Sequence, residues 1–405
     1  MRVFIQLGVV VFALLLVASC GLWDSLFGEK IDCEPLPVSV LSSLSQAEAG
    51  GFHAQAVQVL GDLYGWGHNI HGQIGKATTA DNQYSPLQIG TDDNWAAVSA
   101  GALHTLALRE NGLLWAWGCN EQGQLGTGRS GTNEQEESPV QIGTDTWLQV
   151  SAGGEHSVGI RSDGTLWSWG YNGSGQLGLE HTELRAIPTR VGSVNNWVAV
   201  SAGDHHTLAM RADGSLWSWG NNEYGQLGNG KSGYTTAGIV EMETSPVLIT
   251  LPGKLWHTTP PVFAAGGYHS GALASDGSMY LWGRNNSGQL GRATSTSLLS
   301  IPTLLSRPSG MASAADWSAL ALGTLHSAAL TSDQSLWLWG DNYYGQCGNG
   351  VYGDGKYLAA PTRIGTERYW KQVSLGVHFS LALAEDGTVY AWGADEMGQI
   401  GQGAD

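Results

Sequence analysis

The amino-acid sequence predicts an all-β fold in which seven copies of one four-stranded unit close into a ring. First, a Trp-Gly pair recurs at intervals of 50 to 63 residues, and a Gly-Gln pair always begins six residues after the tryptophan. A fixed period of this size is typical of repeat architectures. Second, 59 glycines and only 13% charged residues suit short strands joined by tight turns. Third, 18 tryptophans are too many for a surface, so we expect them to form the core. The tryptophans of the seven pairs are Trp66, Trp117, Trp169, Trp219, Trp282, Trp339 and Trp392.

The third copy illustrates the strands expected in each unit. A first strand covers 156–160, and Asp163-Gly164 is typical of a type I′ hairpin turn, in which both central residues have positive φ. A second strand covers 166–169, and a loop follows to the Gly-Gln-Leu-Gly turn at 175–178. In the sixth copy Gln334 replaces the hairpin glycine, so we expect a looser turn there.

The two ends of the chain complement one another. The segment 44–50 aligns with 147–153, while the chain ends at 401–405 without such a segment. We therefore expect the first segment to supply the missing part of the last repeat, so that the N-terminal strand or strands complete the seventh blade. A ring closed in this way leaves no open sheet edge.

The N-terminus predicts export and lipid anchoring. Residues 1–19 have a basic start, an apolar run and small residues before Cys20, as a secretory signal peptide does. The stretch 17–20 resembles the bacterial lipobox, which implies cleavage before Cys20 and acylation of that residue, with 20–36 as a tether and 37–405 as the folded domain. Gly21, in place of Asp, favours the outer membrane or cell surface. An ordinary signal peptide or an uncleaved anchor is the alternative.

Net charge argues against a nucleic-acid partner. The chain carries a formal charge of −17 and has no run of basic residues. Phosphate binding needs clustered lysines and arginines that release counterions. We therefore expect no nucleic-acid partner, and the acidity favours cationic ones.

The repeat Ala-Gly-x-x-His-x-x-Ala-Leu-x-x-Asp-Gly-x-Leu-Trp-x-Trp-Gly-x-Asn-x-x-Gly-Gln-Leu-Gly resembles that of the RCC1 (regulator of chromosome condensation) family over residues 37–405. The resemblance implies a seven-bladed β-propeller with four-stranded blades. The best-known eukaryotic member is a guanine-nucleotide exchange factor that also binds histones, and bacterial relatives include secreted propellers that inhibit β-lactamases. An exported protein has no access to a cytosolic GTPase, and the chain shows no clear counterpart of the family's exchange hairpin.

A histidine recurs at one repeat position but does not indicate a metal site. Equivalent positions of adjacent packed sheets lie about 10 Å apart, too far to share one zinc ion. We expect each histidine to form a hydrogen bond within its own blade, and we expect no cofactor. In the seventh copy Phe379 takes the position. The six histidines are His53, His104, His156, His206, His269 and His326.

The other cysteines leave the disulfide pattern open. Cys347 takes the leucine position of the Gly-Gln-Leu-Gly turn and should be a core residue, whereas Cys119 is expected to be exposed. Cys33 lies in the tether, and a bridge from it to Cys119 or Cys347 is an alternative to three free thiols.

Variation between the copies suggests where a partner binds, since loops on a rigid scaffold often carry binding residues. The fourth copy has the longest connecting loop, 229–245, and an extra segment, 252–261. We expect a non-enzymatic protein-interaction scaffold that uses one face of the ring. The alternatives are binding of a cell-wall polymer or glycan and, third, exchange-factor-like activity. The candidate partner-binding residues are Glu134, Glu136, Glu137, Tyr234, Trp256 and His257.

Overall fold

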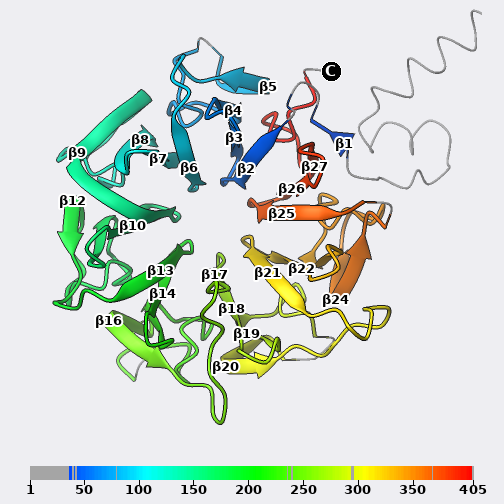
Figure 1. Ribbon diagram of the computed structural model, residues 1–405. Helices are drawn as coiled ribbons and strands as arrows, with labels where there is room; N and C mark the ends of the chain where they lie inside the picture. The colour runs from blue at the N-terminus through cyan, green and yellow to red at the C-terminus, as the bar shows by residue number, and fades with distance from the viewer. Residues whose placement is uncertain are drawn as a thin grey trace, which may run out of the picture.

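The computed structural model describes residues 36–403 except 39, 40, 42, 79, 235, 239, 293–295 and 367. In this part of the chain all regular structure is β, in five four-stranded sheets and one seven-stranded sheet. The seven-stranded sheet holds two blades, because the long strand β9 (Gln135–Ala152) is the outermost strand of one blade and the innermost strand of the next. The sheets therefore amount to seven blades, which surround a central channel (Figure 1).

Six blades take their strands in sequence order from the channel outwards. The first three consist of β2 (Leu44–Ala49), β3 (His53–Gln58), β4 (Leu63–His68) and β5 (Asn82–Gln88); β6 (Trp95–Ala100), β7 (His104–Arg109), β8 (Leu113–Cys119) and β9; and β9, β10 (His156–Arg161), β11 (Leu166–Gly170) and β12 (Arg185–Arg190). The fourth and fifth consist of β13 (Trp197–Ala202), β14 (His206–Arg211), β15 (Leu216–Asn221) and β16 (Met242–Ile249); and β17 (Phe263–Ala265), β18 (His269–Leu273), β19 (Met279–Arg284) and β20 (Leu298–Leu304). The sixth consists of β21 (Trp317–Leu322), β22 (His326–Thr331), β23 (Leu336–Asp341) and β24 (Tyr357–Ile364), and the seventh of β25 (Trp370–Leu375), β26 (Phe379–Ala384), β27 (Val389–Gly393) and β1 (Leu36–Pro37).

The Trp-Gly tryptophans fasten each blade to its predecessor. Trp169 is fully buried, and its Nε1–H donates to the carbonyl oxygen of Gln124 in the preceding blade, 2.8 Å away. The same bond recurs at every junction, including the last, where Trp66 of the first blade donates to Gln399 at 3.0 Å. The Gln side chain meanwhile accepts a backbone N–H two residues earlier, as at Ser174 and Gln176. The tryptophan of each repeat therefore fastens to the Gly-Gln turn of the repeat before it.

The chain ends meet in the seventh blade, where β1 pairs with β27 through Leu36 and Ala391. The prediction that an N-terminal strand completes this blade is confirmed. The prediction that the segment 44–50 supplies that strand is wrong. It forms β2, which pairs with β3 as the innermost strand of the first blade. The segment reaches the last blade through side chains, with the Ala47 N–H donating to Gln372 Oε1 at 3.2 Å.

The hairpins within the blades differ from the expected turn. The Gly164 N–H donates to the Arg161 carbonyl oxygen at 2.9 Å, and only the glycine has positive φ (78°), so this is a type I turn followed by a left-handed glycine. Gln334 adopts the same left-handed conformation (φ 63°) and donates the equivalent bond, to Thr331, at 2.8 Å. The prediction of a looser turn at Gln334 is therefore wrong, because the residue accepts the conformation that glycine favours.

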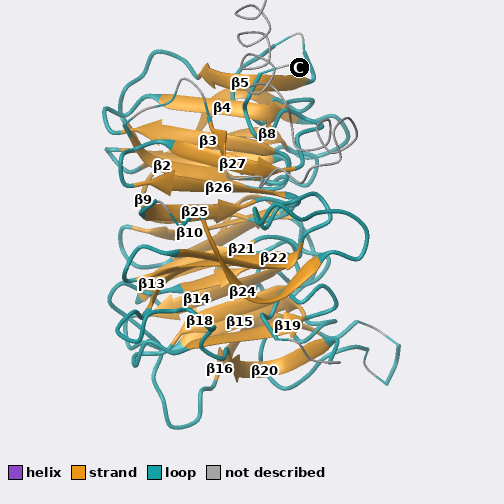
Figure 2. Cartoon of the chain, turned by 90° about the vertical axis from the view of Figure 1, so that its right-hand side faces the viewer, coloured by secondary structure: helices purple, strands orange, loops and turns teal. Residues whose placement is uncertain are grey.

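Successive strands of a blade run in opposite directions, so their connections lie alternately on the two faces of the ring, which Figure 2 shows edge-on. The first strand of each blade ends, and the second begins, on the face that also carries the Gly-Gln turns. We call this the Gly-Gln face. The opposite face, which we call the hairpin face, carries the hairpins such as 162–164 and the connections between blades.

Candidate functional site

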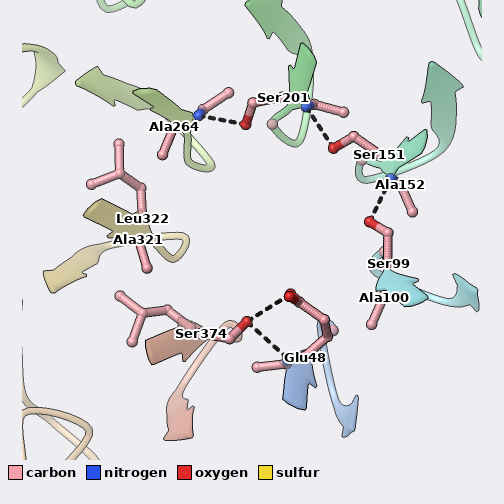
Figure 3. Close-up of a pocket in the computed structure, with 18 of the residues that line it drawn as sticks. Glu48, Ser99, Ala100, Ser151, Ala152, Ser201, Ala264, Ala321, Leu322 and Ser374 are labelled. Carbon is pink, nitrogen blue, oxygen red and sulfur yellow. Dashed lines mark hydrogen bonds between the residues drawn. The ribbon is translucent and has the colours of Figure 1, made fainter. Parts of the chain in front are cut away.

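The innermost strands enclose a central channel with a cavity of about 440 Å³. Residues of the first strands line it, and the turns of the Gly-Gln face form its rim (Figure 3). Neither lysine nor arginine is among the residues that line the cavity in the described part of the chain.

Side chains of one blade cap the exposed inner edge of the next over most of the channel wall. Ser99 Oγ accepts the Ala152 N–H at 3.0 Å, and Ser151 Oγ accepts the Ala202 N–H at the same distance (Figure 3). Glutamines cap a second edge position, since Gln149 both accepts the Val200 N–H at 3.0 Å and donates to its carbonyl oxygen at 3.2 Å. Such caps satisfy backbone groups that an innermost strand leaves without a ladder partner.

Glu48 replaces the capping serine in the first blade and places a carboxylate in the channel wall. Its Oε1 accepts hydrogen bonds from Gln46 and Gln372, both at 3.0 Å, and its Oε2 accepts one from Ser374 at 3.0 Å. Burial raises the pKa of Glu48, although these bonds act in the opposite direction. Burial likewise raises the pKa of Asp204 at the rim, against the effect of His205.

The Gly-Gln face carries two aromatic clusters, one where the fourth and fifth blades meet and one where the sixth and seventh blades meet. In one cluster the rings of Tyr224 and Tyr268 meet edge to face at 5.5 Å, and the Arg284 guanidinium lies 5.0 and 5.4 Å from their centroids. In the other, Tyr343 and Tyr344 are 4.8 Å apart, and Tyr344 lies 4.7 Å from the His378 ring. We call the six residues the tyrosine arc: Tyr224, Tyr268, Arg284, Tyr343, Tyr344 and His378.

Comparison with known proteins decides the family. A model of the RCC1-like domain matches residues 24–254, and a model of the RCC1 repeat matches 276–330 and 333–383. The chain belongs to the RCC1 family. The ultraviolet-B receptor UVR8 of Arabidopsis thaliana is 31% identical to it over 387 residues, which cover 94% of this chain and 82% of the receptor. The human regulator of chromosome condensation is 28% identical over 391 residues, which cover 96% of this chain and 80% of the relative.

Solved structures of RCC1-like propellers share the fold. Human WBSCR16 superposes with a TM-score of 0.74 and 24% identity, covering 89% of both chains. Prp20p of Saccharomyces cerevisiae, described together with its binding to Gsp1p and histones, gives a TM-score of 0.72 and 23% identity, covering 91% of this chain and 85% of Prp20p. At this level of identity the likeness establishes the architecture alone.

The predicted acidic loop of this RCC1 propeller lies on the Gly-Gln face, because it leads into β9. Its charge is partly neutralised, since Arg129 pairs with Glu134 and Glu136. Glu137 is exposed and accepts a hydrogen bond from Gln135 at 3.3 Å. Tyr234 lies on the same face, 62% exposed, with its hydroxyl donating to Glu223 at 3.3 Å.

Trp256 is a core residue, so its prediction as a partner-binding residue is wrong. It is 4% exposed, packs against Tyr280 and Trp282, and donates from Nε1 to the Ile249 carbonyl oxygen at 3.3 Å. Trp197 packs in the same way at the start of its own blade. An insertion separates Trp256 from the strand it belongs to and hides this equivalence in the sequence.

The residues predicted to bind a partner are divided between the two faces of the ring. His257 is half-buried on the hairpin face, where its Nδ1 donates to the Pro260 carbonyl oxygen at 2.7 Å. The acidic loop and Tyr234 lie on the other side, because they connect third to fourth strands, whereas 252–261 connects one blade to the next. The proposed residues therefore do not form one surface.

The repeated histidines join neighbouring blades, so the prediction of bonds within each blade is wrong. His104 Nε2 donates to Ser157 Oγ at 2.9 Å, and Ser157 in turn donates to the Gln124 carbonyl oxygen at 2.7 Å. Five further junctions have the same chain of bonds. Burial lowers the pKa of His104 to about 3, so the ring stays neutral. Within the described residues no group of three or more His, Cys, Asp or Glu could hold a metal ion.

The junction from the seventh blade to the first replaces this polar pair by an apolar one. Phe379 stands in place of histidine, and Ala54 stands where the other blades have serine or threonine. Both side chains are fully buried in one hydrophobic cluster. Both partners of the hydrogen bond are thus replaced by apolar residues, so neither is left as an unpaired polar group.

The cysteines are partly as predicted. Cys347 is a free, fully buried core residue, as expected. Cys119 is also free but only 5% exposed, so the expectation of an exposed thiol is wrong. Burial raises the pKa of both thiols. Cys20, Cys33, the signal peptide and most of the tether lie outside the described residues, and among those described no helix is long and apolar enough to cross a membrane.

Sequence reasoning did not single out Glu48 or the tyrosine arc. Glu48 could have been found, because the aligned position holds Ser99, Ser151, Ser201 and Ser374 in other copies. The arc combines residues of different repeat positions from adjacent blades. Its members become neighbours only through the blade packing.

Proposed function

We propose that the protein is a non-enzymatic, lipid-anchored scaffold that binds a protein partner on the Gly-Gln face. The observation that carries this proposal is the tyrosine arc. Tyr343 and Tyr344 are 47% and 37% exposed, their rings pack against one another, and Tyr344 also packs against His378. Tyrosine and arginine are enriched in binding hot spots, and rings held in place lose little entropy on binding.

Charge suggests the character of the partner. Carboxylates accompany the arc, with Glu223 bonded to the Tyr234 hydroxyl and Asp341 bonded to Gln346 at 2.6 Å. The channel rim adds Asp204, and the chain as a whole carries a formal charge of −17. A basic surface on the partner would be steered towards this face and complement it.

The relatives support the protein-binding role, and the N-terminal sequence supports the lipid anchor. The relatives include the human regulator of chromosome condensation, and yeast RCC1 has been solved bound to Kap60. The pattern in 1–20 supports export and acylation at Cys20, and more than one acyl chain would anchor the protein stably at the outer membrane or cell surface.

Affinity capture of the full chain from detergent-solubilised envelope tests the proposal. The test variant is Tyr343→Ala/Tyr344→Ala, and the matched control is Val59→Ser/Leu60→Ser, which alters two exposed residues of the hairpin face. We expect the wild type and the control to retain one stoichiometric protein that the test variant loses. Retention of cell-wall polymer without a protein partner would instead establish the glycan-binding alternative.

A further inference from the structure

The channel wall has one arc in which the inner strand edges carry no side-chain cap. In the described part of the chain the edges of β2, β6, β9, β13 and β17 each receive at least one serine or glutamine from the preceding blade. Among the described residues the edges of β21 and β25 receive no such cap, because the preceding blades present Ala264 before β21 and Ala321 before β25 (Figure 3). Ala319 takes the glutamine position before β25.

The free groups on β25 follow from the shared register. Val98 pairs with Ala107 and directs its N–H towards the channel, where Gln46 caps it. Val373 holds the equivalent position, so its N–H and C=O face the channel. The Leu375 N–H does the same two residues later. These groups repeat every second residue, the spacing with which an antiparallel strand forms a ladder.

The surroundings of β25 combine this edge with negative charge. The Glu48 carboxylate accepts hydrogen bonds from Ser374 and Gln372, which belong to β25 itself, and Asp204 adds a second carboxylate at the rim. Among the described residues, neither lysine nor arginine lines the cavity beside these two carboxylates. The cavity of about 440 Å³ has room for a few extended residues.

We propose that the channel receives a short extended segment of a partner polypeptide, which pairs with the inner edge of β25 and places a lysine or arginine beside Glu48. The backbone ladder supplies binding in the manner of strand addition, and the carboxylates select the basic side chain. This inference rests on the proposed function, because the segment belongs to the partner that the Gly-Gln face binds.

Two alanine-to-serine variants give a matched test. Ala321→Ser places a hydroxyl where Ser151 caps the next blade, so it should cap the Leu375 N–H of β25. Ala264→Ser should cap the Leu322 N–H of β21 in the same way. Serine occurs at this position in four blades, so both variants are compatible with the fold.

The probe is a blocked hexapeptide of alternating valine and lysine, titrated into the full chain in detergent by isothermal calorimetry. Losing one or two backbone hydrogen bonds corresponds to a roughly tenfold weaker affinity, which we expect for Ala321→Ser but not for Ala264→Ser. N-methylation of the amides along one edge of the peptide should abolish binding. Replacing its lysines by glutamates should do the same, and Glu48→Gln should reduce the preference for lysine.

Equal affinity of the wild type and Ala321→Ser would overturn the inference, as would equal binding of the lysine and glutamate peptides. The capture experiment separates this failure from that of the proposed function. If Ala321→Ser retains the partner and Tyr343→Ala/Tyr344→Ala loses it, the face binds without the channel. If neither variant loses the partner, the proposed function fails as well.

Discussion

The buried histidines should make the protein sensitive to acid, and one double variant tests this. His104→Phe/Ser157→Ala replaces the polar pair between the second and third blades by the apolar pair that Phe379 and Ala54 form where the ring closes. Ser157→Ala alone is the matched control, because it removes the hydroxyl and keeps the titrating ring.

The magnitude follows from the pKa of His104, which burial lowers from 6.5 to about 3. The folded state therefore binds fewer protons than the unfolded state between these values, so stability is fully present above pH 6.5 and is lost as the pH falls towards 3. At pH 5.5, one unit below the unfolded pKa, each such histidine costs on the order of 1 kcal/mol. Burial lowers the pKa of the other five histidines in the same direction, so the whole ring loses several times the stability that one histidine costs.

Urea denaturation monitored by tryptophan fluorescence at pH 8 and pH 5.5 provides the assay. Between these two pH values the double variant should lose less stability than the wild type, by on the order of 1 kcal/mol. The control should lose as much as the wild type. If all three proteins lose the same amount, His104 is not held neutral by burial, and the reasoning fails.

Three further substitutions have expected outcomes that thermal or urea denaturation can check. Trp169→Phe removes the indole bond to Gln124 and should destabilise the protein by roughly 2–3 kcal/mol; an unchanged midpoint would show that the bond does not fasten the blades. Gln334→Gly relieves a left-handed residue and should stabilise by about 0.5–1 kcal/mol, whereas any loss would mean that its side chain outweighs the strain. Glu48 has a raised folded pKa, so the wild type loses stability as the pH rises above 4.5. The stability of Glu48→Gln relative to the wild type should therefore increase between pH 4.5 and 8. A stability difference that does not change with pH would contradict this.

The sequence predicted those features that depend on the spacing within one repeat. The constant interval from Trp169 to Gly-Gln predicted the blades, and the number of tryptophans predicted the core, in which their indoles are buried. Features that depend on the neighbouring blade were missed, because spacing does not say across which junction a histidine donates. Likewise 44–50 and 147–153 align, but alignment cannot tell the innermost strand of one blade from the completion of another.

The division of the candidate site between two faces could have been derived from strand alternation alone. Tyr234 follows a third strand and Trp256 follows a fourth, so an antiparallel blade places them at opposite ends. The burial of Trp256 could not have been derived from the sequence, because its inserted segment has no counterpart in the other copies. The uncapped edge of β25 was accessible only through the register, which shows where the N–H groups of Val373 and Leu375 point.

Hydrogen–deuterium exchange of the full chain, alone and with its captured partner, tests most directly whether the Gly-Gln face is the binding surface. We predict that binding slows exchange in 222–241 and 342–356, which connect third to fourth strands on that face, and leaves 250–262 on the hairpin face unchanged. Protection confined to 250–262 would contradict the account.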